Sequence, residues 1–345
     1  MTARSGLDGI FGHQRPRRVV ALGGGTGMPS VLRGLRRHVT RGGISSLTGI
    51  VAMTDDGGSS GRLRRTRGLP PPGDVRNCLV ALSPEEDLLA ALCQHRYDGS
   101  EEIGGHTVGN LILAALAEQT GSFLKAIEVS SRVLRVAGRI LPATSDDVML
   151  EAIFDDGTVM TGETAIAACE RKIDRIGVRP STARATPGVV DAILSADLVI
   201  LGPGSLYTSL VPNVVIAEIG AALRQTEGQV VLIANIVSER GEAAGLHLAD
   251  HLRVLEEHAG GPFLDAVLVH DGPIDAEVLE RYRAEGAVPL RWSGESDGRI
   301  RILRRNLIGY GPKLRHDSEA TCQSLFELWS GYSTEFGIRR RVNSR

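Results

Sequence analysis

The chain has 345 residues, of which 42% are apolar and 23% charged, so it is long enough to bury a substantial core without covalent cross-links. Its 39 basic and 41 acidic residues give a net charge of -2, which provides no chain-wide attraction to nucleic acid or to an anionic membrane. The four cysteines lie far apart and form no CxxC pair, so we expect reduced, mostly buried thiols and no structural zinc.

No segment of the chain has the length of apolar sequence that is needed to cross a bilayer. The N-terminal residues 1–17 contain arginine and glycine but lack the apolar stretch of a signal peptide. We therefore expect a cytoplasmic protein with no membrane span and with a disordered tail at 1–17.

The folded part is predicted to begin with a strand, a tight loop and a helix. An apolar run at 18–22 leads into the glycine-rich residues 23–27, and apolar residues then recur at helical spacing. A second apolar run at 47–53 ends in the sequence TDDGGSSG at 54–61. Because glycine and serine do not readily continue a helix or a strand, we interpret this segment as a functional loop.

Helices are predicted after the proline-rich stretch at 70–73. We expect Asp74 to cap the first of them, which then carries Asn77 in its first turn. Further helices are expected at about 87–96, 109–119 and 123–134.

The pattern changes from about residue 138, where apolar residues begin to alternate. Asp155-Asp156-Gly157 lies between two extended runs, which indicates a hairpin. Three apolar strands then follow, each separated from the next by a predicted helix, at 196–201, 230–234 and 266–269.

This alternation of strand and helix predicts an α/β protein with a Rossmann-like, doubly wound and mainly parallel sheet. The β-rich stretch predicts a smaller insertion lobe at about 138–180. We expect one nucleotide-binding domain spanning 18–335, followed by a basic tail at 336–345.

Three polar, glycine-rich loops follow directly on predicted strands. In an open parallel sheet the loops at the carboxyl ends meet in one crevice, where ligands bind. Backbone N–H groups and helix N-termini in such loops suit a diphosphate, and hydroxyl groups add donors. The residues expected to bind the ligand are Gly24, Gly25, Thr26, Gly27, Gly58, Ser59, Ser60, Gly202, Gly204, Ser205, Tyr207 and Thr208.

The first loop is not a complete dinucleotide-binding fingerprint, because Met28 occupies the place of the third glycine. It could instead be a tight strand-to-helix turn, and the same holds for the loop at 202–209, although its helix is expected only after Pro212-Asn213. The chain contains no G-x-x-x-x-G-K-[ST] motif, which argues against a P-loop phosphotransferase.

Charged residues near the second loop allow several roles. Asp55 and Asp56 could bind a ribose, hold Mg²⁺ beside a diphosphate or simply form a solvated turn. His106 could donate to phosphate, act as an acid or base, or serve only as a partner for a helix cap. Arg62 opens a basic run and is a candidate phosphate clamp.

Taken in order, these stretches resemble the superfamily of 2-phospho-L-lactate transferases, and within it the YvcK-like branch called gluconeogenesis factors. The resemblance runs from about 18 to 317. The sequences that carry it are ALGGGTG (21–27), TDDGGSSGRLR (54–64), PPGDVRN (71–77), GHTVGNL (105–111), GRILP (138–142), LGPGSLYTSLVPN (201–213) and RHD (315–317).

The resemblance implies a Rossmann-like protein that binds a nucleotide diphosphate conjugate. In the transferase branch the donor is a guanosine diphosphate-linked lactyl compound, the acceptor is a deazaflavin, and Mg²⁺ assists. The gluconeogenesis-factor branch is associated with UDP-sugar binding and with cell shape and envelope synthesis on gluconeogenic carbon sources. TDDGGSSGRLR and PPGDVRN are closer to this second branch.

Further ligand-binding residues are expected within or beside these motifs, namely Asn77, Asn110, Asn213, Asn235, Tyr282 and Arg315. The resemblance assigns Tyr282 to base stacking and Arg315 to the diphosphate. The chain departs from the branch after Asn235, where IVSER (236–240) and GLH (245–247) replace an expected Met-Thr-Gln-Pro run and a Gly-Tyr-Thr. The tyrosine of that expected Gly-Tyr-Thr is absent here, and it would belong to the side of the pocket that holds the sugar or the acceptor.

Three functions remain open. The first is a regulatory protein that binds a UDP-sugar, with Mg²⁺ at Asp55 and Asp56, a regulatory protein partner or a homo-oligomer, and no tightly bound organic cofactor. The second is a transferase that moves a 2-phospholactyl-like group to a deazaflavin. The third, a nicotinamide dehydrogenase, is disfavoured by Met28 and by the three-loop arrangement. We favour the first, because phosphate donors are abundant while no catalytic residue can be named.

Overall fold

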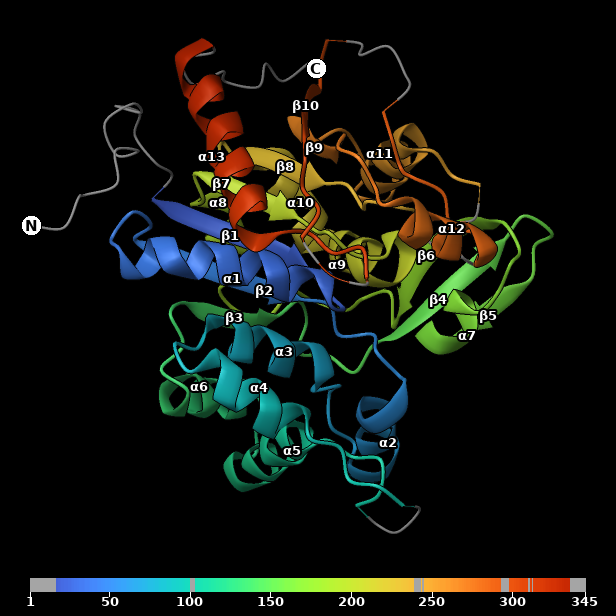
Figure 1. Ribbon diagram of the computed structural model, residues 1–345. Coiled ribbons are helices and arrows are strands. Elements are labelled where there is room, and N and C mark those ends of the chain that lie inside the picture. Colours follow the sequence, from blue (N-terminus) through green and yellow to red (C-terminus); the bar gives the residue numbers. More distant parts are fainter. Residues whose placement is uncertain are drawn as a thin grey trace, which may run out of the picture.

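The computed structural model describes residues 17–99, 103–238, 243, 245–292, 298–309, 311 and 313–335. The predicted tails at 1–17 and 336–345 lie outside these residues, apart from Arg17. A seven-stranded sheet in the order β10-β9-β8-β7-β1-β2-β3 forms the centre of the described chain (Figure 1). All of its described strand pairs are parallel, which confirms the predicted Rossmann-like α/β fold.

The strands of this sheet are β1 (Arg18–Gly23), β2 (Ser46–Val51), β3 (Arg139–Pro142), β7 (Leu198–Leu201), β8 (Gln229–Ile233), β9 (Ala266–His270) and β10 (Arg301–Arg305). The helices of the N-terminal half are α1 (Gly27–Thr40), α2 (Gly58–Arg67), α3 (Gly73–Leu82), α4 (Glu86–Gln94), α5 (Val108–Thr120) and α6 (Phe123–Val133). Those that follow are α7 (Glu163–Ala167), α8 (Val189–Leu194), η1 (Leu206–Leu210), α9 (Val211–Val214), α10 (Ala217–Gln225), α11 (Leu248–His258), α12 (Ala276–Ala284) and α13 (Ser318–Glu335).

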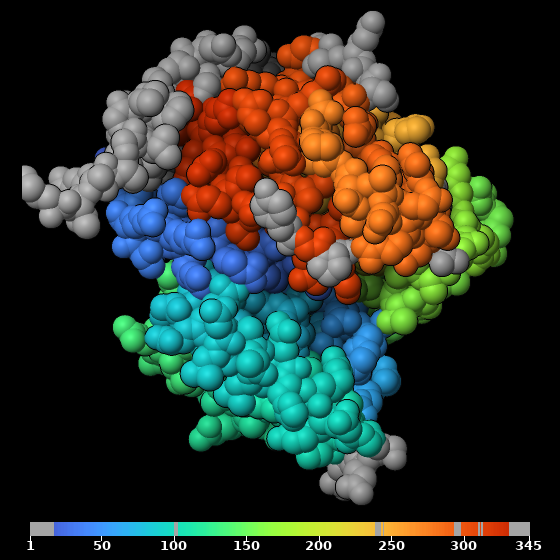
Figure 2. Space-filling view, viewed as in Figure 1, coloured from blue at the N-terminus to red at the C-terminus, as the bar shows by residue number. Residues whose placement is uncertain are grey.

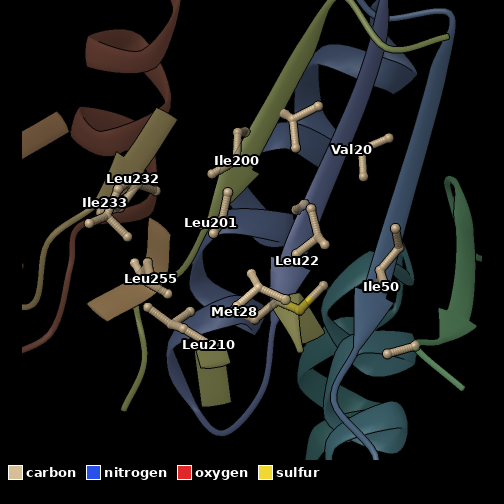
Figure 3. Close-up of a cluster of buried hydrophobic side chains, with 14 of the residues drawn as sticks. Val20, Leu22, Met28, Ile50, Ile200, Leu201, Leu210, Leu232, Ile233 and Leu255 are labelled. Atoms are coloured by element: carbon tan, nitrogen blue, oxygen red, sulfur yellow. The ribbon is translucent and has the colours of Figure 1, made fainter. Parts of the chain in front are cut away.

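Helices cover both faces of the sheet, so its central strands are apolar and enclosed. Every residue of β7, β8 and β9 is buried, as expected for parallel strands packed on both faces. Figure 3 shows Leu22, Ile50 and Leu232 among the side chains of this core. Met28 is fully buried there, and a Cβ on Gly49 would lie 3.1 Å from its Cε, so the residue in the third-glycine position serves core packing.

A second, antiparallel sheet of three strands forms the predicted smaller lobe, in the order β5-β4-β6. Its strands are β4 (Met149–Phe154), β5 (Val159–Thr161) and β6 (Ile173–Arg179). The hairpin predicted at Asp155–Gly157 is confirmed, with Gly157 at φ 80°. The predicted lobe also included β3, but β3 pairs with β2 in the main sheet. The division into domains stays a prediction.

The prediction of a loop at 54–61 is wrong for its second half, because α2 begins at Gly58. Gly57 is extended (φ -86°, ψ 160°) and starts the helix, and Gly68 ends it in the left-handed region (φ 65°). Basic residues in the last turn interact favourably with the helix dipole, and Leu63 is buried. These contributions outweigh the low helix propensity of glycine and serine.

Two other boundaries differ from the prediction. The chain after β7 becomes helical at Leu206, in the π-helical turn η1, rather than after Pro212-Asn213. Helix α3 begins at Gly73 with Pro72 at its N-cap, so Asp74 is the second helical residue and not the cap. Its carboxylate bonds to another loop instead.

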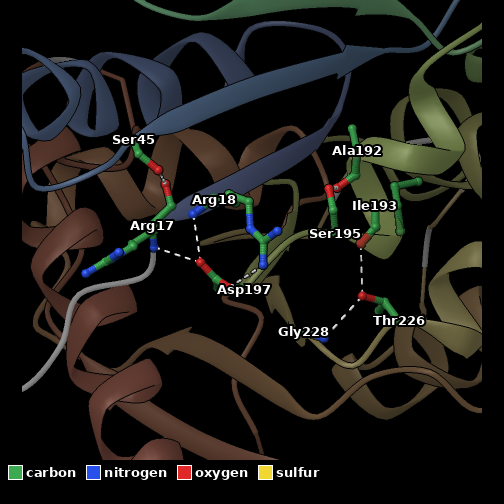
Figure 4. Close-up of polar contacts among 9 residues, drawn as sticks. All are labelled: Arg17, Arg18, Ser45, Ala192, Ile193, Ser195, Asp197, Thr226 and Gly228. Atoms are coloured by element: carbon green, nitrogen blue, oxygen red, sulfur yellow. Dashed lines mark hydrogen bonds and ion pairs between the residues drawn. The ribbon is translucent and has the colours of Figure 1, made fainter.

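The amino ends of the strands are joined by polar contacts, shown in Figure 4. Asp197 Oδ2 accepts hydrogen bonds from the backbone N–H groups of Arg17 and Arg18, each at 2.8 Å. Thr226 Oγ1 donates to the Ile193 carbonyl at 2.9 Å. These contacts lie at the edge opposite to the carboxyl ends, where the predicted ligand-binding loops begin.

Cys78, Cys93 and Cys322 are buried, Cys169 is partly buried, and all four are free thiols. Within the described residues no single helix is long and apolar enough to cross a membrane. One bent pair, Leu206–Val214 with Ala217–Gln225 at 79°, passes that test by length and composition only.

Candidate functional site

A cavity of about 570 Å³ lies beyond the carboxyl ends of the parallel strands. The loops after β1, β7 and β8 line it, and α12 and the segment before α13 complete it. We call it the strand-end cavity. Its lining includes the predicted residues Gly25, Thr26, Gly27, Gly204, Ser205, Thr208, Asn235, Tyr282 and Arg315. The structure thus brings the first and third glycine-rich loops together, as expected for an open parallel sheet.

Close packing between these two loops explains the glycines of the first. A Cβ on Gly27 would lie 2.2 Å from the Pro203 carbonyl oxygen, so no larger residue fits. Gly25 adopts φ +63°, and its N–H donates to Asp74 Oδ2 at 2.5 Å. A Cβ on Gly24 would approach the same carboxyl oxygen at 3.1 Å. The Gly25 amide, predicted to meet phosphate, is therefore bonded to a protein carboxyl group.

The third loop is held by its own polar contacts. Gly204 N donates to Asn235 Oδ1 at 3.0 Å, and Asn235 Nδ2 donates to Gly204 O at 2.9 Å. Thr208 Oγ1 donates to Ser205 Oγ at 2.6 Å, which closes the first turn of η1. Gly202 turns the chain at φ +76°. This geometry leaves Ser205 and Thr208 at the cavity wall.

Two residues predicted from this motif do not reach the strand-end cavity. Tyr207 is 4% exposed and belongs to the apolar core. Asn213 is 1% exposed, and its Nδ2 donates to the Ser209 carbonyl at 2.8 Å. Both residues pack behind the loop.

The second loop lies outside the lining of this cavity. Asp55 Oδ1 accepts from Gly57 N at 2.9 Å. Asp56 Oδ1 accepts from the backbone N–H and the hydroxyl of Thr164, at 2.9 and 2.6 Å, and so ties the loop to the lobe. No group of three or more described His, Cys, Asp or Glu side chains is arranged for a metal. Mg²⁺ beside a diphosphate needs only one or two carboxylates, so this site stays a prediction.

His106 has a partner that the sequence did not reveal. Its Nδ1 lies 3.0 Å from Ser59 Oγ, and Asn110 Nδ2 donates to the same hydroxyl at 3.0 Å. Both Ser59 and His106 are buried, and burial together with Arg62 and Arg96 lowers the pKa of His106. The three predicted residues form a network that joins α2 to α5.

The other predicted residues of α2 also make structural contacts. Arg62 donates to the Gly104 carbonyl, and Ser60 Oγ accepts from Gly73 N at 3.1 Å. Gly58 occupies the first helical position with φ +43°. The structure thus places these residues between helices rather than at the strand-end cavity.

Sequence reasoning missed two carboxyl groups beside the first loop. Burial, together with the nearby Asp55, raises the pKa of Asp74 to about 6. Burial raises the pKa of Glu163 to about 8, and Asp55 and Asp74 raise it further, whereas a hydrogen bond from Thr54 opposes the change. Glu163 lines the strand-end cavity although it comes from the lobe. Asp74 lay in a recognised motif, but nothing in the sequence signalled Glu163.

Residues from the C-terminal part of the chain form another wall of the strand-end cavity. Tyr282 Oη accepts from Leu314 N at 3.1 Å, which holds the phenol against the segment before α13. His316 Nε2 lies 3.2 Å from the Ala234 carbonyl oxygen, and burial lowers the pKa of His316 to about 4. Within the described part of the chain, the guanidinium of Arg315 has no hydrogen bond or ion pair, so it is available to an anion.

The segment that departs from the resembled branch also borders the cavity. Ile236, Val237 and Ser238 line it, whereas residues 239 and 240 lie outside the described chain. Ser238 exchanges hydrogen bonds with the Val288 backbone at 2.7 and 3.0 Å. This wall is therefore part apolar and part hydroxyl.

Asn77, the remaining predicted residue, lines a second cavity of about 320 Å³ between α1, α3 and α4. Its Oδ1 accepts from Arg76 Nη2 at 2.9 Å. Thr26, Ser30 and Arg315 belong to the linings of both cavities, so the two adjoin.

The chain is similar to one family model, to gluconeogenesis factors of other bacteria and to a solved structure. The family model described as 2-phospho-L-lactate transferase CofD matches residues 19–308. The chain is 38% identical over 318 residues to the gluconeogenesis factor of Bacillus subtilis, across 91% of this chain and 98% of that protein. It is 42% identical over 276 residues to the gluconeogenesis factor of Halalkalibacterium halodurans, across 80% and 84%. A crystal structure of a UPF0052-family protein from Bacillus halodurans matches with TM-score 0.83 and 37% identity, across 90% of this chain and 98% of that one.

Proposed function

This chain belongs to the CofD family, and we propose that it acts as a gluconeogenesis factor that binds a UDP-sugar and regulates other proteins without transforming its ligand. The strand-end cavity carries this proposal, because it joins two glycine-rich loops, hydroxyl groups, an aromatic ring and an unpaired guanidinium. Its volume falls within the usual range for small-molecule sites. The chain would act in the cytoplasm, in cell shape and envelope synthesis on gluconeogenic carbon sources.

Each part of the cavity has a role that fits a nucleoside diphosphate. Arg315 would pair with the diphosphate, since a guanidinium can bond two phosphate oxygens at once. The N-terminus of α1 adds partial positive charge, and Thr26 and Ser205 add hydroxyl groups. Tyr282 would stack on the base.

The cavity holds few groups that could perform chemistry. With its pKa lowered to about 4, His316 is neutral at physiological pH, and it already contacts the Ala234 carbonyl. The Glu163 carboxyl, with a pKa of about 8, keeps its proton at neutral pH and is a poor base. These states support binding over turnover.

One observation favours the alternative, a transferase that moves a 2-phospholactyl-like group to a deazaflavin. A protonated carboxyl group at the cavity wall, such as Glu163, could act as a general acid toward a leaving oxygen. Binding and turnover therefore have to be measured on the same sample.

The test uses the full chain with UDP-N-acetylglucosamine, UDP-glucose, GDP and NAD, each with and without Mg²⁺. We expect calorimetry to detect UDP-sugar binding that Arg315→Gln weakens at least tenfold, while Arg41→Gln, at the far end of α1, retains it. Chromatography should recover the sugar nucleotide unchanged. Release of UMP, UDP or free sugar above a heat-killed control, lost in Glu163→Gln, would overturn binding without turnover and favour the transferase.

A further inference from the structure

Four arginines line the 320 Å³ cavity that adjoins the strand-end cavity. They are Arg33 from α1, Arg76 from α3, Arg96 after α4 and Arg315 before α13. In Figure 2 the surfaces of α1 (blue), of the α3–α5 region (cyan) and of the C-terminal part (red) meet on one face. We call this second space the arginine cavity. Its charged walls come from segments that are distant in the sequence.

The positive charge of the arginine cavity is only partly balanced by the protein. Glu86 is the one carboxylate in its lining, and it is already bonded to Arg33 at 2.5 Å and to Arg36 at 3.1 Å. Arg76 and Arg96 make no ion pair with any described residue, and neither does Arg315. The lining therefore presents three arginines without a bonded carboxylate.

Arg76 is the strongest indication of an anion site among these residues, because it is largely buried. Its Nη1 donates to Thr107 Oγ1 at 2.6 Å and to Asn110 Oδ1 at 2.7 Å, so neutral oxygens fix its orientation. Its Nε is buried and has no hydrogen-bond partner among the described residues. Burial lowers its pKa and Arg96 lowers it further, whereas the carboxylates of Asp74 and Asp55 oppose the change at longer range.

Burying a guanidinium is costly unless an anion accompanies it. A largely buried arginine that is oriented by neutral groups, beside a cavity with further arginines that make no ion pair with described residues, has the properties of a phosphate site. Tetrahedral oxyanions suit it, because a guanidinium binds them through several N–H donors. Arg76 and Arg96 keep N–H groups beyond those that bond Thr107, Asn110, Asn77 and the Gly105 carbonyl. The residual volume has room for the organic part of a small phosphate monoester.

We propose that the arginine cavity binds a small phosphorylated molecule as a second ligand, next to the nucleotide and at the same time as it. Arg76 and Arg96 hold its phosphate, and Arg315 lies between the two ligands. Because α1, α3 and the segment before α13 meet there, occupancy of the arginine cavity would also be sensed at the strand-end cavity.

The test measures binding of inorganic phosphate and of glycerol 3-phosphate to the full chain by calorimetry, with glycerol as the uncharged control. Each titration is repeated with UDP at saturation, so that the strand-end cavity is already filled. The variants are Arg96→Gln, whose side chain is exposed and whose loss the fold should tolerate, and Arg76→Gln. Arg41→Gln removes the same charge from the exposed end of α1 and serves as the matched control.

We expect both phosphate probes to bind in the presence of UDP, glycerol not to bind, and Arg96→Gln and Arg76→Gln to weaken binding at least tenfold. Arg41→Gln should bind as the parent chain does. The proposal is wrong if UDP displaces the probes, if Arg96→Gln binds them normally, or if they do not bind at all. If the probes bind in this pattern while no nucleotide binds, the nucleotide proposal fails and this one stands.

Discussion

Replacing Glu163 by glutamine tests whether an unusual carboxyl group borders the strand-end cavity. Glutamine keeps the shape of the side chain and its acceptor for the Thr54 hydroxyl, which donates to Glu163 Oε2 at 2.6 Å. It removes only the ability to ionise. We therefore expect the variant to differ from the parent chain mainly in how its stability depends on pH.

The sign and size of this effect follow from the pKa of Glu163, about 8 in the folded chain against an ordinary value of 4.5. The folded state holds this proton more tightly than the unfolded state does. The stabilisation is therefore complete below pH 4.5 and is lost as the pH rises through 8. Because one pKa unit corresponds to roughly 1.4 kcal/mol, the loss has an upper limit of about 5 kcal/mol.

Urea unfolding from about pH 4.5 to pH 9 measures this loss as the difference in unfolding free energy between Glu163→Gln and the parent. The difference should shift in favour of the variant by several kcal/mol across that range. The contribution of Asp74 comes mainly from its own burial, which both proteins share, so most of it cancels. Glu128→Gln removes a charge from the exposed face of α6 and should not reproduce the shift. A difference that stays constant with pH would refute the burial argument for Glu163.

Three further predictions concern the first and third glycine-rich loops and Asp55. Gly27→Ala should destabilise the fold by about 1–3 kcal/mol in urea unfolding, because its Cβ would lie 2.2 Å from the Pro203 carbonyl oxygen; Gly177→Ala, which meets nothing within 4 Å, should cost less. Gly204→Val should abolish nucleotide binding, since its Cβ would lie 3.0 Å from that of Ser209; unchanged calorimetric affinity in a folded variant would contradict this. Asp55→Ala should weaken nucleotide binding more with Mg²⁺ than without it, and an equal loss in both conditions would favour ribose binding.

Much of the fold could be predicted from the sequence because its central strands are continuous apolar runs. The segments at 18–22, 230–234 and 266–269 were recognised as strands within a residue or two of their observed ends. Strand β10 was missed, because its sequence RILRR lies at the sheet edge with mostly half-buried residues and resembles a basic surface segment. Helix α2 was missed because contacts outside the segment stabilise it.

The candidate site was predicted less completely than the fold. Local motifs located the loops after β1 and β7, and the structure brings those loops together. The motif at 54–64 was expected at the same cavity, but Ser59 and Arg62 bond to α5 and to the loop before it. A motif identifies candidate site residues, whereas the direction in which each side chain points depends on tertiary contacts.

The carboxyl groups show most clearly why the sequence did not predict the whole candidate site. Asp55, Asp74 and Glu163 come from three separate segments, yet Asp55 raises the pKa of the other two. Each bonds to a nearby polar group, Asp55 to Gly57, Asp74 to Gly25 and Glu163 to Thr54, and Glu163 lines the strand-end cavity. A diphosphate arriving there would be repelled by the full set of negative charges. A proton on Glu163 relieves part of that repulsion at neutral pH, and a divalent cation would relieve it in the same way. On the proposed function, the loops that line the cavity are held by carboxyl groups whose charge has to be neutralised when the nucleotide binds.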